Sequence, residues 1–87
     1  MEFEWDENKS RLNKSKHGID FNTATELWND QDRIEIQTNF PAENRNALIG
    51  KIENKIWTAI FTRRVYAIRI ISVRRARKKE TKLYERK

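Results

Sequence analysis

The stretch from Val65 to Arg77, V-Y-A-I-R-I-I-S-V-R-R-A-R, limits the possible folds more than any other part of the chain. It is rich in β-branched and aromatic residues, which favour a β-strand. Arg69 interrupts this apolar run, and three further arginines follow closely. Burying an unpaired charge costs free energy, so an arginine inside a core strand needs a use for its charge. We therefore expect this strand to lie at the centre of the fold and to form the floor of a functional site.

Charge is unevenly distributed along the 87 residues, which have a net charge of +6. Residues 1–62 contain 8 Lys or Arg and 11 Asp or Glu, whereas residues 63–87 contain 11 Lys or Arg and only Glu80 and Glu85. The net charges are therefore −3 and +9. A basic segment beside a mildly acidic body indicates a polyanionic partner, most commonly a nucleic acid. An acidic protein partner and a merely solvated basic tail are the alternatives.

Length and composition point to one small domain over residues 1–87. The chain has no cysteine, so disulfides and thiolate metal sites are excluded. No apolar run approaches the roughly 20 residues of a membrane span, and the acidic start M-E-F-E-W-D does not resemble a signal peptide. We expect a soluble, cytoplasmic protein that does not associate with membranes.

Two helices are expected near the N-terminus, after a short strand over residues 2–5. Asp6 is suited to cap a helix over residues 7–16, which has only Leu12 as an apolar anchor and ends at Gly18. Asp20 is suited to cap a second helix, whose apolar residues recur at helical spacing. These residues are Phe21, Ala24, Leu27 and Trp28.

Alternating apolar residues then predict strands near Ile34 and Ile36, over residues 45–53 and over residues 56–62. Pro41 lies in an expected loop over residues 39–44, Gly50 indicates a bulge or a close backbone approach, and Asn54 is suited to a tight turn. Arg63 and Arg64 are expected to form a short hairpin turn into the Val65–Arg77 stretch. After Arg74 the period becomes helical, with Ala76, Glu80, Leu83 and Tyr84 on one face. The fold class is α+β: an antiparallel sheet of three or four main strands, two N-terminal helices and a C-terminal helix.

Several blocks of the sequence together resemble one known family. They are F-E-W-D-E-N-K from Phe3, N-x-x-K-H-G-I-D-F from Asn13, A-x-x-L-W-x-D from Ala24, E-x-R-x-x-x-I-G from Glu43 and R-I-I-S-V-R-R-A-x-K-x-E-x-x-x-Y from Arg69. In this order and at this spacing the chain resembles the BrnT toxins of bacterial type II toxin–antitoxin systems. The resemblance covers nearly the whole chain.

The resemblance implies a compact RelE-like ribonuclease fold and toxicity through RNA cleavage that inhibits translation. It also implies a partner, a small ribbon-helix-helix antitoxin similar to BrnA, in a complex of two toxins and two antitoxins. In such a complex the antitoxin binds the operator DNA, and the toxin contacts DNA only through it.

RNA cleavage by attack of the 2′-hydroxyl needs a proton acceptor, a proton donor and positive charge around the transition state. The chain has one histidine, no H-x-x-x-H pair and no tight carboxylate cluster. A two-histidine mechanism is therefore excluded, and we expect neither a metal nor another cofactor. The expected mechanism is electrostatic catalysis by arginine, assisted by one acid–base group.

The candidate catalytic residues are Arg69, Arg74, His17, Glu80 and Tyr84. The candidate RNA-binding residues are Lys16, Arg63, Arg64, Arg75, Arg77 and Lys79, and Tyr66 or Trp57 could stack on a base if exposed. Structural alternatives exist for these residues. His17 could close a helix end, Arg69 could bind a carboxylate such as Glu80, and Glu80 and Tyr84 could hold the arginines in place.

Strand alternation sets a condition on this site. Arg69 and Arg74 lie five residues apart, so in a regular strand their side chains point to opposite faces, with Val73 on the face of Arg69. Both reach one site only if the strand bends or ends between them, and we expect the strand to break into a helix near Arg75.

Two other functions compete with a ribonuclease toxin. One is a nonenzymatic nucleic-acid-binding module that only contacts phosphates. The other is a structural protein that binds an acidic partner through the same basic surface.

Overall fold

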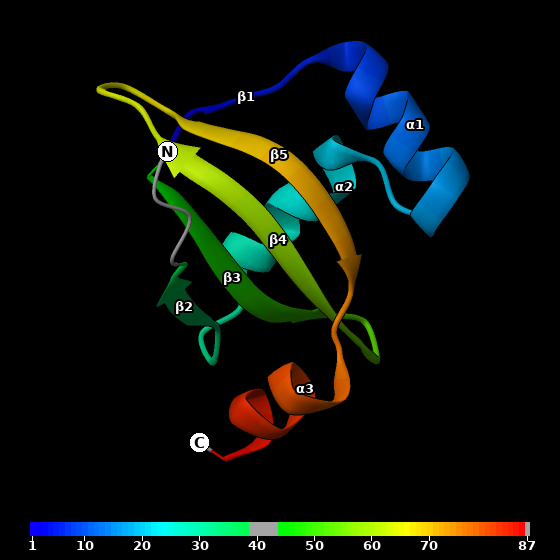
Figure 1. The fold of residues 1–87 in the computed structure, drawn as a ribbon, viewed down its shortest axis with the longest axis vertical. Helices are drawn as coiled ribbons and strands as arrows, with labels where there is room; N and C mark the ends of the chain where they lie inside the picture. Colours follow the sequence, from blue (N-terminus) through cyan, green and yellow to red (C-terminus); the bar gives the residue numbers. More distant parts are fainter. Residues whose placement is uncertain (39–43, 87) are drawn as a thin grey trace.

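The computed structural model describes residues 1–38 and 44–86, whose helices and strands follow the expected order (Figure 1). The elements are β1 (Phe3–Glu4), α1 (Glu7–His17), α2 (Phe21–Ala24), the 3₁₀ helix η1 (Thr25–Asn29), β2 (Ile34–Gln37), β3 (Arg45–Ile52), β4 (Lys55–Arg63), β5 (Ile68–Arg75) and α3 (Lys78–Glu85). The loop expected around Pro41 lies outside the described residues, apart from Asn44. None of the helices within the described ranges has both the length and the apolar character needed to cross a membrane.

The strands form one sheet in the order β1-β5-β4-β3-β2. Strands β2 to β5 pair antiparallel, whereas β1 runs parallel to the start of β5. The α+β class is confirmed. The expected antiparallel sheet of three or four main strands needs correction, because the two-residue β1 adds a fifth, parallel strand. Only the three-dimensional pairing reveals this role, since the Ile68 amide donates to the Glu2 carbonyl at 2.9 Å across 66 positions of sequence.

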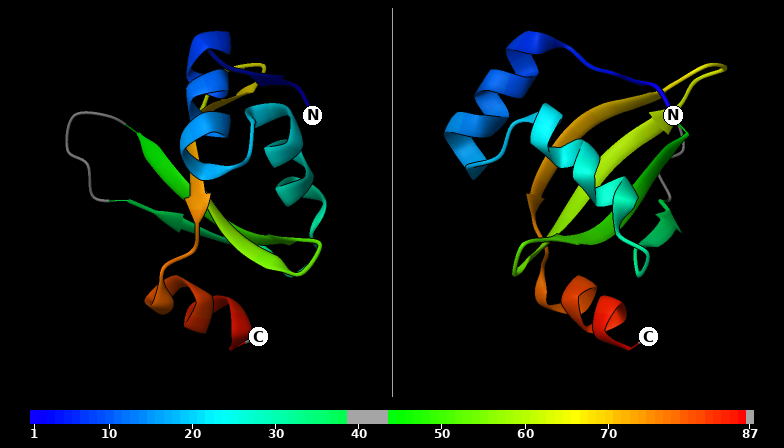
Figure 2. Two further views of the ribbon diagram at one scale, coloured as in Figure 1. Left: turned by 90° about the vertical axis from the view of Figure 1, so that its right-hand side faces the viewer. Right: turned by 180° about the vertical axis from the view of Figure 1, so that it is seen from behind.

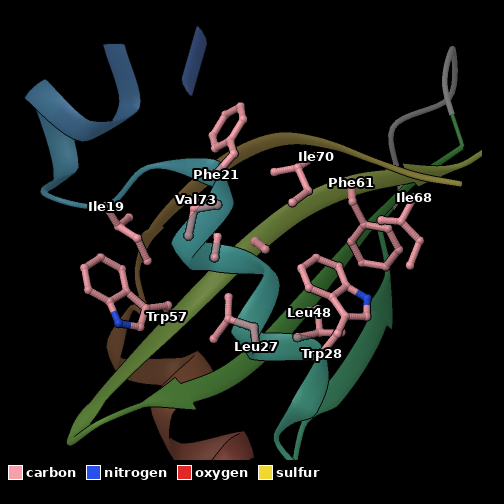
Figure 3. Packing of buried hydrophobic residues seen from close by; sticks show 12 residues of the cluster. Ile19, Phe21, Leu27, Trp28, Leu48, Trp57, Phe61, Ile68, Ile70 and Val73 are labelled. Atoms are coloured by element: carbon pink, nitrogen blue, oxygen red, sulfur yellow. The ribbon is translucent and has the colours of Figure 1, made fainter. Parts of the chain in front are cut away.

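The helical segment of α2 and η1 lies across the back face of the sheet (Figures 1 and 2). Phe21, Leu27 and Trp28 point from it toward side chains of β3, β4 and β5 (Figure 3). The Trp28 ring meets the Phe61 ring edge-on, with centroids 5.2 Å apart. Ala24, Leu27, Ala59 and Phe61 have no exposed surface, so the apolar stripe predicted for this helix forms one side of the core.

Gly50 allows η1 to approach β3 closely. A Cβ atom at this position would lie 3.2 Å from Leu27 Cδ2 and 3.3 Å from the Leu27 carbonyl oxygen. This close backbone approach was one of the two roles expected for Gly50. The neighbouring Asp30 accepts a hydrogen bond from the Lys51 amide at 2.8 Å, which fixes the end of η1 against β3.

The helix α1 begins and ends as predicted, but its attachment differs from the expectation. Asp6 caps its start, and Gly18 follows its end with a φ of +83°. Leu12 is 68% exposed and is not the anchor. The buried residues of α1 are instead polar: Ser10 accepts a hydrogen bond from the Phe21 amide, and Asn13 bonds to the edge of β5. A helix anchored by hydrogen bonds shows no apolar stripe in its sequence, which explains the error.

Two turns also differ from their predicted geometry. The β4–β5 hairpin turns at residues 64–67, where the Arg64 amide donates to the Ala67 carbonyl at 2.8 Å. Val65 and Tyr66 are therefore exposed at its tip, although the sequence placed them in the strand. In the β3–β4 turn the residue with positive φ is Glu53, at +56°, and not Asn54.

Candidate active site

A β-bulge in β5 brings the predicted arginines to one face of the sheet. Arg69 is paired with Thr62 and Arg74 with Thr58, but the register shifts between Ile60 and Phe61 of β4. Ile71 is the extra residue of β5 at this shift. Because an extra residue reverses the alternation beyond it, Arg69 and Arg74 share the front face, which faces the viewer in Figure 1.

This bulge meets the condition that the strand bend between the two arginines. β5 also ends at Arg75, shortly before α3 begins at Lys78, as expected. One expectation is corrected. Val73 belongs to the opposite face from Arg69, where it is fully buried in the core. The bulge falls at an isoleucine, and neither glycine nor proline occurs in the strand around it. The sequence therefore did not indicate a bulge there.

A cationic hollow of about 400 Å³ lies on the front face, around Arg69. Its lining residues come from α1, the start of β3, the β4–β5 hairpin and β5. They are Lys9, Asn44, Arg45, Thr62, Arg63, Arg64, Arg69 and Ile71. The row Arg45–Thr62–Arg69 crosses three neighbouring strands, so the backbones of the two arginines lie about 10 Å apart. Two long side chains at this separation can contact one phosphate from both sides.

Two carboxylates pair with Arg63, Arg64 and Arg69 of this hollow. Arg69 Nη1 lies 3.2 Å from Glu4 Oε2, and Arg64 Nε lies 3.7 Å from the same oxygen. The guanidinium of Arg63 donates to both oxygens of Glu35, which lowers the pKa of that carboxyl. The carboxylate partner expected for Arg69 is therefore Glu4 rather than Glu80. Partly exposed pairs of this kind contribute only about 0–1 kcal/mol, so a phosphate can compete for these arginines.

A second, smaller hollow continues the first along β5. It has a volume of about 200 Å³ and is lined by Lys9, Leu12, Asn13, Lys16, His17, Ile71 and Ser72. Lys9 and Ile71 line both hollows, so together they form one groove between α1 and the front face. We call it the α1–β5 groove. It places Lys16 and the half-buried His17 at one end and the cluster around Arg69 at the other.

A groove lined by Lys and Arg, with one histidine, suits binding of a polyanion backbone and charge stabilisation at a phosphate. A family model described as the ribonuclease toxin, BrnT, of type II toxin–antitoxin systems matches residues 5–80. The chain belongs to this family. None of the curated proteins compared with the chain matches it. Membership in the BrnT family gives the chain a ribonuclease activity, an RNA target and an antitoxin partner.

Arg74 and Glu80 form a separate, half-buried cluster on the same face. Arg74 donates to both Glu80 oxygens at 2.7 and 2.9 Å, and Thr58 and the Arg77 amide donate to the same carboxylate at 3.0 and 2.8 Å. These bonds, that of Arg74 above all, lower the pKa of Glu80 to about 2. The carboxylate is thus a weak proton acceptor, and its contacts join the start of α3 to the sheet.

This cluster makes the free energy of unfolding depend on pH in the acid range. Glu80 has a folded-state pKa of about 2 against an ordinary 4.5, so its contribution is complete above pH 4.5 and is lost as the pH falls toward 2. We expect the wild type to lose about 3 kcal/mol more unfolding free energy than Glu80→Gln between pH 6 and pH 2. Urea unfolding at several pH values measures this difference.

Glu85→Gln is the matched control, because Glu85 is an exposed carboxylate on the same helix. Its pH dependence should follow that of the wild type. Equal acid dependence in wild type and Glu80→Gln would show that the ion pair with Arg74 does not stabilise the fold.

Tyr84 lies at the opposite end of the molecule from the β4–β5 hairpin, on α3 (Figure 1). Its hydroxyl donates to Asp30 Oδ2 at 2.6 Å, and burial together with this bond raises the pKa of Tyr84 to about 12. Tyr84 holds its proton against Asp30, and the contact docks α3 beside η1 and β3. The structure does not bring it together with Arg69 or His17.

Three predicted RNA-binding residues also lie away from the α1–β5 groove. Arg75 points to the face opposite Arg74, with its guanidinium 5.5 Å from the centre of the Trp57 ring. Arg77 precedes α3 and donates its amide to Glu80. Lys79 is exposed on α3, in a different hollow with Lys82, Leu83 and Arg86. Trp57 itself is 7% exposed and is a core residue.

Sequence reasoning missed Lys9, Arg45 and Glu4 as parts of the site. All three lie in the acidic N-terminal part of the chain, where single charges looked like ordinary surface residues. Only strand pairing places Arg45 in one row with Arg69, and only the β1–β5 pairing places Glu4 opposite it. The basic residues of the candidate site thus come from four elements, and the sequence analysis had named residues of the first helix, the hairpin and the last strand but none of β3.

Proposed function

We propose that this protein is a RelE-like, metal-independent endoribonuclease, one toxin domain over residues 1–87, that cleaves RNA in the α1–β5 groove and thereby inhibits translation. The carrying observation is that five basic residues line one front-face hollow: Lys9, Arg45, Arg63, Arg64 and Arg69. The guanidinium of Arg63 itself turns toward Phe61 and Glu35, so the side chains of the other four supply the charge. Family membership indicates that the substrate is RNA. The groove lies on the front face, which α2 and η1 do not cover, and positive charge is concentrated there.

In the proposed reaction a 2′-hydroxyl attacks the adjacent phosphorus and the 5′-oxygen of the next nucleotide leaves. The products are a 2′,3′-cyclic phosphate and a 5′-hydroxyl. Arg69, assisted by Arg45, stabilises the additional negative charge of the transition state. His17, at the other end of the same groove, is the candidate acid–base group, and it exchanges a proton with a reacting oxygen if the reacting phosphate binds between it and Arg69.

The electrostatics of the groove support a reaction without a metal ion. Its basic residues repel a divalent cation, and the nearby carboxylates of Glu4 and Glu35 are engaged with arginines. The guanidinium groups supply the positive charge that a metal ion supplies in other nucleases.

The proposed partner is a ribbon-helix-helix antitoxin that silences the toxin in a complex of two toxins and two antitoxins. Operator DNA is bound by the antitoxin and not by this chain. The site of action is the cytoplasm, where ribosomes and messenger RNA are present.

Purified protein incubated with RNA and a chelator tests the activity. We expect cleavage to continue in EDTA, to leave 2′,3′-cyclic phosphate ends and to stop when the antitoxin is added. The assay is run on free RNA and on ribosome-bound RNA, since either can be the substrate.

Two results would contradict this proposal in different ways. Cleavage that EDTA abolishes and Mg²⁺ restores would refute the metal-independent mechanism. RNA that is bound but stays intact in both assays would favour the nonenzymatic nucleic-acid-binding module.

A further inference from the structure

We propose that the tip of the β4–β5 hairpin forms a subsite for one unpaired RNA base, which stacks on Tyr66. The proposal rests on the proposed function, because it concerns RNA bound in the α1–β5 groove. It adds a base-binding surface outside the groove and predicts that the toxin binds single-stranded RNA there.

The first observation is the exposure of the hairpin tip. Tyr66 is 87% exposed and Val65 is 88% exposed, and neither contributes to the core. The turn that carries them is closed by the hydrogen bond from Arg64 to Ala67. An exposed aromatic ring on a fixed turn provides a flat surface for stacking without reorganisation of the fold.

The second observation is a hollow of about 240 Å³ at this tip. It is lined by Met1, Glu2, Arg63, Arg64, Tyr66, Ala67 and Ile68. Arg63 and Arg64 also line the cationic hollow around Arg69, so the two hollows meet at these arginines. The hydrogen bond from the Ile68 amide to the Glu2 carbonyl fixes the other wall.

This juxtaposition fits a nucleotide. A nucleotide has a phosphate at one end and a flat base at the other, and here a pair of arginines separates a phosphate-binding hollow from an aromatic surface. Bases stack on tyrosine with little regard to sequence, because every base has a π-face. A base within a duplex is not available for such stacking, so the subsite selects single-stranded RNA.

Binding of oligonucleotides with an abasic residue at each position in turn tests the subsite. The 2′-hydroxyls are methylated so that no cleavage occurs. For wild type, we expect one position at which loss of the base weakens binding about 10-fold. Tyr66→Ala should bind the intact oligonucleotide about 10-fold more weakly and show no further loss at that position, whereas Tyr66→Phe should match wild type.

Leu83→Ala is the control, because it removes another partly exposed apolar side chain, on α3 and away from the hairpin. It should bind like wild type. If Tyr66→Ala retains wild-type affinity or remains sensitive to the abasic position, the subsite is refuted while RNA binding stands. Loss of antitoxin binding in Tyr66→Ala with unchanged RNA binding would likewise refute it and assign the tip to the antitoxin. Wild type that binds no RNA would refute the proposed function as well.

Discussion

Replacement of Arg69 by alanine should slow RNA cleavage by about 10²- to 10³-fold without unfolding the protein. Arg69 is the arginine of β5 that faces the cationic hollow, and its pair with Glu4, at 3.2 Å, is partly exposed and contributes little to stability. Its loss removes charge that the transition state needs more than the ground state does. Single-turnover cleavage rates measure the effect, and relief of growth arrest on induced expression reports it in cells.

Arg86→Ala is the matched control, because it removes the same charge from the exposed end of α3. Its cleavage rate should stay within a few-fold of wild type. Arg69→Lys should recover only part of the activity, because lysine keeps the charge but lacks the bidentate geometry of arginine. Equal rates for Arg69→Ala and Arg86→Ala would mean that the reacting phosphate does not bind at this hollow.

Local features of this chain were predictable because their causes lie within a few residues. Asp6 and Asp20 cap helices through bonds to amides two or three positions away. Gly18 adopts the left-handed conformation that ends α1, and the apolar stripe of α2 and η1 is buried as its spacing indicates. Each of these signals is complete within one helical segment.

The geometry of the candidate site depends on contacts between residues that are far apart in the sequence. The bulge at Ile71 results from how β5 pairs with β4, and it decides that Arg69 and Arg74 share a face. Glu80 and Tyr84 were predicted as acid or base candidates, but their partners Arg74 and Asp30 draw them into the attachment of α3. A list of reactive residue types therefore identified the strand that lines the groove, but it could not distinguish residues in structural ion pairs from residues that face the groove.

The position of α1 beside the groove depends on Asn13, which acts as a substitute for a neighbouring strand. Its Nδ2 donates to the carbonyls of Val73 and Ile19 at 2.9 and 2.8 Å, and its Oδ1 accepts from the Val73 amide at 3.1 Å. These bonds satisfy the backbone groups of Val73 at the edge of β5, which the two-residue β1 is too short to reach. Since α1 carries Lys9, Lys16 and His17, the same side chain fixes one wall of the groove.

Asn13→Asp should therefore lower the unfolding free energy at pH 7 by about 3 kcal/mol or more. The carboxylate cannot donate to either carbonyl, and a residue that is 7% exposed brings its charge against two carbonyl oxygens. For a chain of this length the loss is a large part of the total stability. Urea unfolding followed by tryptophan fluorescence measures it.

Asn8→Asp makes the same chemical change at an exposed position in the first turn of α1, where negative charge is compatible with the helix dipole. It should change the unfolding free energy by less than about 0.5 kcal/mol. At pH 4 the deficit of Asn13→Asp relative to wild type should shrink, because a protonated carboxyl can donate one hydrogen bond and carries no charge. A deficit independent of pH would show that lost packing, rather than the reversed hydrogen bonds to Val73 and Ile19, destabilises the variant.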